Sequence, residues 1–220
     1  MRIIERRGLG AGDALPSTAE LAVSMGVSRN IVREAIAELA GQGLIERRQG
    51  REATITLPDA QQLERLLRLR FAIKGADYES LEEYREILEV GSARLAAQRI
   101  TPESAARLAK HVEDLRASTS DEEQFQVDQA FHIEVARASG NEMLLLALES
   151  TNSLLIELRR RAWVGWIRAG QSPEAVIEAH QDILDRIVAG DSEGAARAME
   201  VNLHQAQSGL AADKSSEASG

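Results

Sequence analysis

Two short helical patterns lie close together near the start of the chain, separated only by the pair Gly26-Val27. Ser17 and Glu20 have the spacing of a capping box, in which a serine oxygen and a glutamate carboxylate each accept a hydrogen bond from a free backbone N–H. Ser28 has a capping position for the second pattern. The arrangement predicts a helix-turn-helix, whose second helix enters the DNA major groove with its N-terminal end. The side chains at that end suit DNA contacts: Ser28, Arg29, Asn30 and Arg33.

Two strand-like runs follow, at residues 44–48 and 53–57, and Gly50 lies between them. Glycine tolerates the positive φ that a hairpin turn needs, so this pattern predicts a β-hairpin with Gly50 at its tip. A hairpin after a helix-turn-helix is the outline of a winged helix. Three arginines would then bring positive charge to phosphates or to a minor groove: Arg47, Arg48 and Arg51. Taken alone, they fit a solvated surface equally well.

Charge is distributed unevenly along the 220 residues. Residues 1–58 carry eight basic and seven acidic side chains, whereas residues 59–220 carry 18 basic and 28 acidic ones. The second part is therefore a poor surface for nucleic acid, and DNA affinity must come from placed arginines and from pairing two copies. There is no cysteine, so thiolate chemistry is excluded. No apolar run approaches the roughly 20 residues of a membrane span, and no signal peptide is evident. We expect a cytoplasmic protein without membrane contact.

Helical periodicity dominates the chain after residue 58, and no convincing strand follows. Glycines, prolines and a serine–threonine cluster divide it into helical patterns at about 59–74, 79–98, 102–117, 121–138, 141–168, 173–189 and 192–208. The predicted fold class is mainly α. We expect a winged helix-turn-helix at 1–57, a linker and connecting helix at 58–75, an antiparallel bundle of six or seven helices at 76–210, and a disordered tail at 211–220.

Three of the four histidines fall on helix faces that we expect to be buried. His180 lies within the apolar stripe of its helix, and His204 adjoins an apolar position on the last one. His132 follows Asp128 by four residues, so the two side chains share one helix face. Imidazoles and a carboxylate suit a borderline divalent metal. The alternative is that the histidines are core residues whose ring nitrogens bond within the protein.

The N-terminal motifs LPSTAELA, GVSRNIVREAI and GLIERRQG resemble, in this order, the winged helix of the GntR regulators over roughly residues 3–57. The resemblance implies that Ser28, Arg29, Asn30 and Arg33 contact bases and phosphates, and that Gly50 enters the minor groove. Two positions depart from the family. Ala19 stands where the family commonly has a DNA-contacting arginine, and Asn30-Ile31 replaces the common Thr-Pro. The missing arginine implies a departure from the family's usual operator core and affinity, and Asn30-Ile31 implies an altered base preference.

A second resemblance covers roughly residues 60–210. Its motifs are Tyr84 to Glu89, Ala93 to Ala97, Asp128-x-x-x-His132, Ser139-Gly140-Asn141, Glu178-Ala179-His180 and Leu203-His204. They resemble the FCD effector domain of the FadR subfamily. The resemblance implies one divalent metal ion per subunit, with zinc, nickel and manganese all compatible, held by Asp128, His132, His180 and His204.

The same resemblance implies a small carboxylate effector beside the metal. It assigns Arg85 to the effector carboxylate, a task suited to the planar guanidinium, and Asn141 to a further effector contact. The alternative is that Arg85 is an ordinary helix-surface partner of Glu89 or Glu82.

These observations predict a transcription repressor that binds a palindromic double-stranded operator as a homodimer and responds to a small organic acid. A metal-responsive regulator, with the ion itself as signal, stays open. An Asp-His₃ metal could also activate water in a hydrolase. The lack of an evident general-base motif and the presence of a DNA-reading domain argue against an enzyme.

Overall fold

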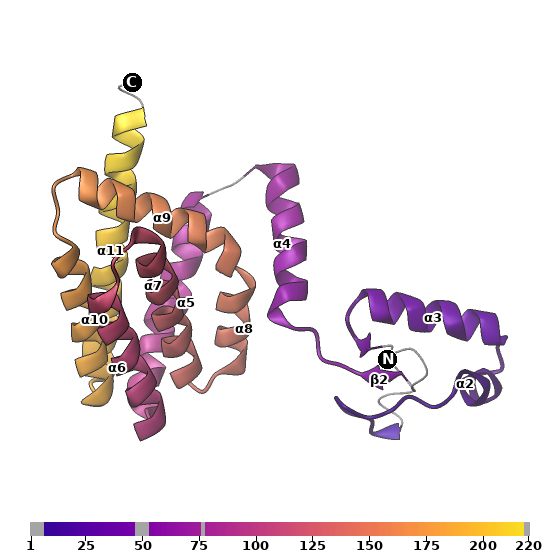
Figure 1. Cartoon of the computed structure of the whole chain (residues 1–220). Coiled ribbons are helices and arrows are strands. Elements are labelled where there is room, and N and C mark those ends of the chain that lie inside the picture. Colours follow the sequence, from indigo (N-terminus) through magenta and orange to yellow (C-terminus); the bar gives the residue numbers. More distant parts are fainter. Residues whose placement is uncertain (1–6, 47–52, 76–77, 218–220) are drawn as a thin grey trace. The chain divides into compact units, whose positions relative to one another are not determined.

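The computed structural model describes residues 7–46, 53–75 and 78–217. The chain divides into two compact units, Met1–Arg65 and Leu66–Gly220, and the boundary falls within helix α4 (Ala60–Lys74). Figure 1 shows the short helices and strands of the first unit and the helical second unit. Within the described ranges, no helix combines the length and apolar character needed to span a bilayer.

The first unit contains the predicted pair of short helices, α2 (Thr18–Met25) and α3 (Arg29–Gly41). The capping box is present, since Ser17 Oγ accepts from Glu20 N and the Glu20 carboxylate accepts from Ser17 N. Helix α2 ends at Gly26, whose left-handed φ of 66° favours glycine. Ser28 caps α3 by accepting from Ile31 N. Local capping therefore sets the tight turn between the helices.

A two-stranded antiparallel sheet follows, formed by β1 (Ile45–Glu46) and β2 (Thr54–Ile55). Ile45 pairs with Ile55, and both side chains are buried with Leu15. These strands confirm the base of the predicted wing. Its tip, from residue 47 to residue 52, lies outside the described residues.

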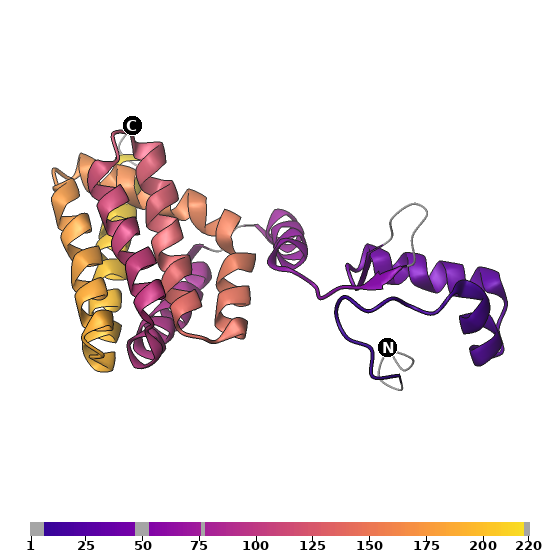
Figure 2. The same cartoon turned by 60° about the horizontal axis from the view of Figure 1, so that its bottom comes forward.

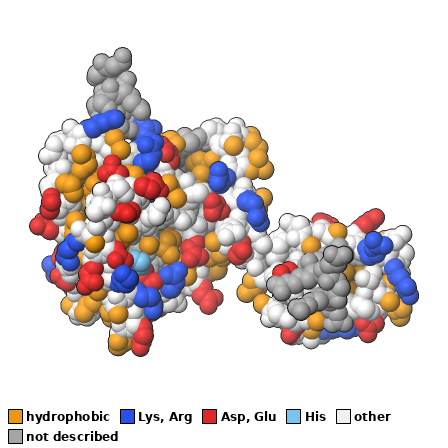
Figure 3. All heavy atoms as spheres, viewed as in Figure 1, with side chains coloured by type: hydrophobic (Ala, Val, Ile, Leu, Met, Phe, Trp, Pro, Cys, Tyr) orange, Lys and Arg blue, Asp and Glu red, His pale blue; other side chains and the backbone are white. Residues whose placement is uncertain are grey.

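The second unit is helical throughout its described part. Its helices after α4 are α5 (Tyr78–Arg99), α6 (Pro102–Ala117), α7 (Asp121–Ala138), α8 (Glu142–Ser150), α9 (Asn152–Arg168), α10 (Pro173–Val188) and α11 (Ser192–Glu217). Figures 1 and 2 show α5, α6, α7, α10 and α11 running up and down side by side. Side chains of both charges are interspersed over the face seen in Figure 3. The predicted mainly α class is confirmed.

Two helix boundaries differ from those predicted. The single pattern at 141–168 is two helices, because Ser150 and Thr151 turn their hydroxyl groups back onto the carbonyls of Ala147 and Leu148. The last helix was expected to end at 208 before a disordered tail. It continues to Glu217, and no glycine or proline lies between Leu210 and that residue.

The core of the helical unit consists of two clusters. One joins α5, α6, α7, α10 and α11 and includes the fully buried Phe131 and Ile183. The other includes Leu155 and Leu158 of α9. Since Phe131 precedes His132 and Ile183 follows His180 by three residues, this packing fixes the two helices that carry those histidines.

Gly209 of α11 packs against the backbone of α9 and provides a test of this packing. A Cβ there would lie 2.0 Å from the carbonyl oxygen of Ala162, so Gly209→Ala must force the two helices apart. Overpacking typically costs about 1–3 kcal/mol, and we expect a loss of that size in the free energy of unfolding by urea. Gly91→Ala on α5 is the matched control, since open space surrounds its Cβ and stability should stay the same or rise. Equal stability of Gly209→Ala and the wild type would contradict this packing.

Candidate functional site

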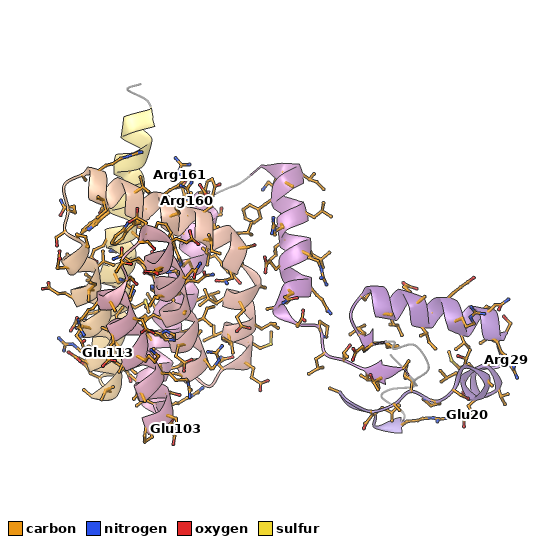
Figure 4. The ribbon with its side chains drawn as sticks, in the orientation of Figure 1. Glu20, Arg29, Glu103, Glu113, Arg160 and Arg161 are labelled. Atoms are coloured by element: carbon orange, nitrogen blue, oxygen red, sulfur yellow. The ribbon has the colours of Figure 1, made fainter. Side chains whose placement is uncertain are left out.

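The start of α3 presents the predicted DNA-contacting residues to solvent. Ser28, Arg29, Asn30 and Arg33 are all exposed, whereas Val32 on the opposite face is buried against α2. Figure 4 shows Arg29 at the end of α3 next to α2. Neither Arg29 nor Arg33 has an ion-pair partner among the described residues. Both guanidinium groups are thus available for an external anion.

The remaining DNA-binding predictions concern the wing. Arg47, Arg48, Gly50 and Arg51 lie outside the described residues, so their roles stay predictions. Ala19, the position of the family's usual arginine, is half-buried on α2.

Ionisable side chains meet inside the helical unit. Four helices contribute the ionisable side chains: Arg85 and Glu89 from α5, Asp128 and His132 from α7, Arg159 from α9, and His180 from α10. A fifth helix, α11, contributes the amide of Asn202. All are buried except Asp128, whose side chain is 22% exposed. The structure therefore brings together three of the four predicted metal ligands and the predicted effector arginine.

The neighbours of the two Nδ1 atoms fix how the two histidine rings point. Nδ1 of His180 lies 2.7 Å from the carbonyl oxygen of Val176, and Nδ1 of His132 lies against Oε2 of Glu89. Acceptors at both Nδ1 atoms place the protons there and leave Nε2 with a free lone pair. Both Nε2 atoms face Oδ1 of Asp128, at 3.1 Å from His180 and 3.7 Å from His132. The two rings and the carboxylate therefore converge on one point.

This convergence fits a divalent cation. The ligand atoms of Asp128, His132 and His180 all lie within 4.8 Å of one another. Neither Nε2 forms a hydrogen bond with any described residue, although both atoms are buried. The lone pairs of the two Nε2 atoms and the negative carboxylate of Asp128 repel one another unless a cation lies between them. A metal-bound histidine also usually donates its other ring N–H to a carboxylate or a backbone carbonyl, and these are the neighbours of the two Nδ1 atoms here.

His204 is not part of this group, which corrects the predicted ligand set. It is exposed and lies near Glu86 and Glu200 instead. Asn202, two residues earlier on α11, is the side chain that faces the cluster, and its amide lies 3.4 Å from Nδ1 of His180. Residues two apart on a helix point about 200° away from each other. The Leu203-His204 motif therefore gave the correct helix but the wrong face.

Asn141 is also displaced from its predicted role. Its side-chain oxygen caps α8 by accepting from Met143 N and Leu144 N, and the residue does not line the cavity beside Asp128.

Two guanidinium groups neutralise the buried carboxylates. Arg85 donates to Oε1 of Glu89 at 2.7 Å, as one of the alternative readings proposed, and Arg159 donates to the same oxygen at 3.0 Å and to Asp128. Burial by itself raises the pKa of Glu89, but Arg85, His132 and Arg159 outweigh it and hold that pKa well below its ordinary value. Burial likewise raises the pKa of Asp128, but the positive charge of Arg159 opposes burial, and this pKa lies well below its ordinary value. Both carboxylates are ionised.

Sequence reasoning missed Arg159. It stands in a run of three arginines, and Arg160 and Arg161 lie on the outer side of α9 (Figure 4). The signal was present in the helical spacing, because Arg159 is four residues from the buried Leu155 and three from the buried Ala162.

A cavity of about 60 Å³ adjoins Asp128. Its polar wall consists of Arg85, Gln124, Asp128, Arg159, Asn202 and Gln205. Its apolar wall consists of Leu115, Phe125, Ala162, Trp163, Trp166, Val176 and Ala206. A compact ligand there would reach both arginines and the point on which the histidines converge.

Known proteins share this architecture. Residues 1–55 match the bacterial regulatory proteins of the gntR family, and residues 79–205 match the FCD domain. The HTH-type transcriptional regulator LutR of Bacillus subtilis is 32% identical over 203 residues, which cover 91% of this chain and 93% of LutR. The chain belongs to the gntR family.

Other members extend the comparison. The galactonate operon transcriptional repressor of Escherichia coli is 28% identical, covering 85% of this chain and 82% of the repressor. The solved structure of Streptococcus agalactiae GntR has a TM-score of 0.67 and 26% identity, covering 93% of both chains. This gntR-family protein is therefore a DNA-binding transcription regulator with an FCD domain, and not an enzyme.

The ion pairs of Glu89 with Arg85 and Arg159 predict that the stability of the helical unit is sensitive to a substitution of Glu89. Glu89→Gln keeps the shape of the side chain but removes the negative charge that Arg85 and Arg159 share. Breaking a buried ion pair costs about 3–5 kcal/mol, so we expect a loss on that order in the free energy of unfolding. Glu193→Gln is the control, because its pair with Arg94 is exposed and is worth less than about 1 kcal/mol. Similar losses in the two variants would show that the network does not stabilise the bundle.

Proposed function

We propose that this regulator is a repressor whose operator binding is controlled by a small carboxylate effector bound beside a divalent cation in the FCD domain. One observation carries the proposal: the unpartnered Nε2 atoms of His132 and His180 converge on ionised Asp128. The cation would be held by these three residues, and zinc, nickel and manganese all suit the donor set. When bound, it supplies positive charge and open coordination positions for effector oxygens.

Charge balance explains why an acid should bind there. Arg85 and Arg159 balance Glu89 and Asp128 while the imidazoles are neutral. A divalent cation adds two positive charges to a buried site, and an anion offsets this excess. Arg159 has a donor left for the effector, since its Nε has no hydrogen-bond partner among the described residues. The domain thereby attracts an anion in spite of the chain's overall negative charge.

The DNA-binding units of two protomers act together on one operator. One α3 helix covers few base pairs, and a twofold homodimer places two such helices in successive major grooves of a palindromic operator. We also propose membership of the FadR subfamily, which the FCD match supports, and a cytoplasmic location, which membership in a family of DNA-binding regulators supports. Effector binding would shift α5, α7, α9 and α10 relative to one another and bias the winged helices through α4. Coupling of this kind typically amounts to about 1–3 kcal/mol, enough to release an operator.

The function is tested by operator mobility shifts with the protein's own upstream DNA. We expect zinc-loaded protein to bind and a panel of small carboxylates to contain one that releases it. Loss of binding on chelation, with no effect of any acid, would make the metal ion itself the signal. Operator binding that ignores both chelator and acids would contradict control through the FCD domain.

Metal content separates the two candidate sets of ligands. His180→Ala should lose stoichiometric metal because it removes one of three converging donors. His204→Ala should keep the metal, since that side chain lies on the surface beside Glu86 and Glu200. The measurement is elemental analysis after purification without chelator. Loss of metal in His204→Ala and its retention in His180→Ala would overturn the assignment.

Operator affinity tests the exposed start of α3. Arg29→Ala or Arg33→Ala should weaken specific binding by about 1–3 kcal/mol, the usual loss for a bidentate base contact. The control is Arg116→Ala on α6, which removes an exposed arginine from the helical unit and should leave operator affinity unchanged. Unaltered affinity in both α3 variants would exclude α3 as the reading helix.

A further inference from the structure

One exposed side of α3 carries a shallow hollow of about 350 Å³ near the start of the helix. Four side chains line it: Asn30, Arg33, Glu34 and Ala37. The last three follow Asn30 by three, four and seven residues, which places all four on one side of the helix. Because the side chain of Ala37 is short, the hollow leaves room for the edge of a base pair.

The charges in this hollow suit base edges better than the DNA backbone. The carboxylate of Glu34 lines it and repels phosphate oxygens, which carry charge of the same sign. Base edges in the major groove, in contrast, include N–H donors that a carboxylate or an amide oxygen can accept. The hollow therefore favours direct contact with bases.

The amide of Asn30 is free for such a contact. The side chain is exposed and forms no hydrogen bond with any described residue. Ser28 caps the helix instead, by accepting from Ile31 N. The amide of Asn30 thus keeps both an acceptor oxygen and N–H donors for an external group. In the major groove, adenine offers the matching pair, an N6 donor beside an N7 acceptor, whereas guanine offers two acceptors there.

We infer that Asn30 determines operator specificity by reading an adenine in each half-site, with its amide oxygen accepting from N6–H and its amide N–H donating to N7. The inference rests on the proposed pairing of two α3 helices on a palindromic operator. Arg33 lies about 4.5 Å further along the helix axis, and neighbouring base pairs are about 3.4 Å apart. The adenine should therefore lie within about two base pairs of a guanine, the base that suits the guanidinium of Arg33.

Selection from a pool of random DNA duplexes tests the inference. Full-length, zinc-loaded protein is used without added acids, as the wild type and as Asn30→Ala. We expect the wild type to enrich a palindrome with one A·T pair in each half at which Asn30→Ala accepts any base pair. The rest of the selected sequence should stay the same.

Two further variants narrow the interpretation. Asn30→Asp has nearly the same shape but cannot donate to N7, so it should also lose the preference for adenine. Gln42→Ala is the control, because it removes an exposed amide from the other end of α3 and should select the wild-type sequence.

Modified bases then identify the atoms that are read. 7-Deazaadenine lacks the N7 acceptor and purine lacks the N6 amino group, and each replaces the selected adenine in turn. We expect each to weaken wild-type binding at least about fivefold, since each removes half of a bidentate contact that contributes roughly tenfold or more. The affinity of Asn30→Ala should change by less than about twofold. This comparison cancels any effect of the modified base on the duplex itself.

The outcomes separate the inference from the function beneath it. Retention of every base preference by Asn30→Ala, or relaxation at a G·C pair instead, would overturn the inference and leave the proposed function standing. Equal sensitivity of the wild type and Asn30→Ala to the two modified bases would do the same. A wild-type protein that enriches no palindrome would overturn both the inference and the proposed pairing.

Discussion

The structure depends on a group of charges buried between the helices of the FCD domain. The carboxylate of Glu89 is taken out of water and that of Asp128 is largely covered, and such burial is tolerated only when each charge is paired and hydrogen-bonded. Arg85 and Arg159 supply the pairing. Because these partners come from α5, α7 and α9, the helices cannot shift independently. Under the proposed function, the ion pairs that hold the bundle together are also the ones that a bound effector would rearrange.

This dual role connects stability with regulation. The described side chains balance one another in charge, whereas a bound divalent cation leaves an excess of positive charge in a medium of low dielectric constant. Under the proposed function, an organic anion would remove the excess and compete with Asp128 for Arg159. Its binding would then change contacts between helices, and these changes would bias the orientation of the attached DNA-binding unit. The coupling needs no long-range pathway beyond packed helices with alternative ion pairing.

Local signals made much of the fold predictable. The capping residues Ser17 and Ser28 set the turn of the helix-turn-helix, and helical periodicity located most helices of the bundle. The site was only partly predictable. Whether a residue belongs to it depends on which face of its helix packs against the neighbouring helices. Periodicity did not decide between Asn202 and His204, which lie two residues apart on α11, and packing against α5 and α10 selected Asn202. Arg159 was missed because it is one of three consecutive arginines, and the sequence alone did not show which of them faces the neighbouring helices.

Anomalous X-ray diffraction from crystals of the zinc-loaded protein tests the proposed metal site most directly. We expect one strong zinc peak inside the FCD domain, at roughly 2.0–2.2 Å from Nε2 of His132, Nε2 of His180 and a carboxylate oxygen of Asp128. Asn202 would adjoin the site, and His204 would lie outside it. A zinc peak only beside Glu86, Glu200 and His204, or no peak within the bundle, would contradict the account.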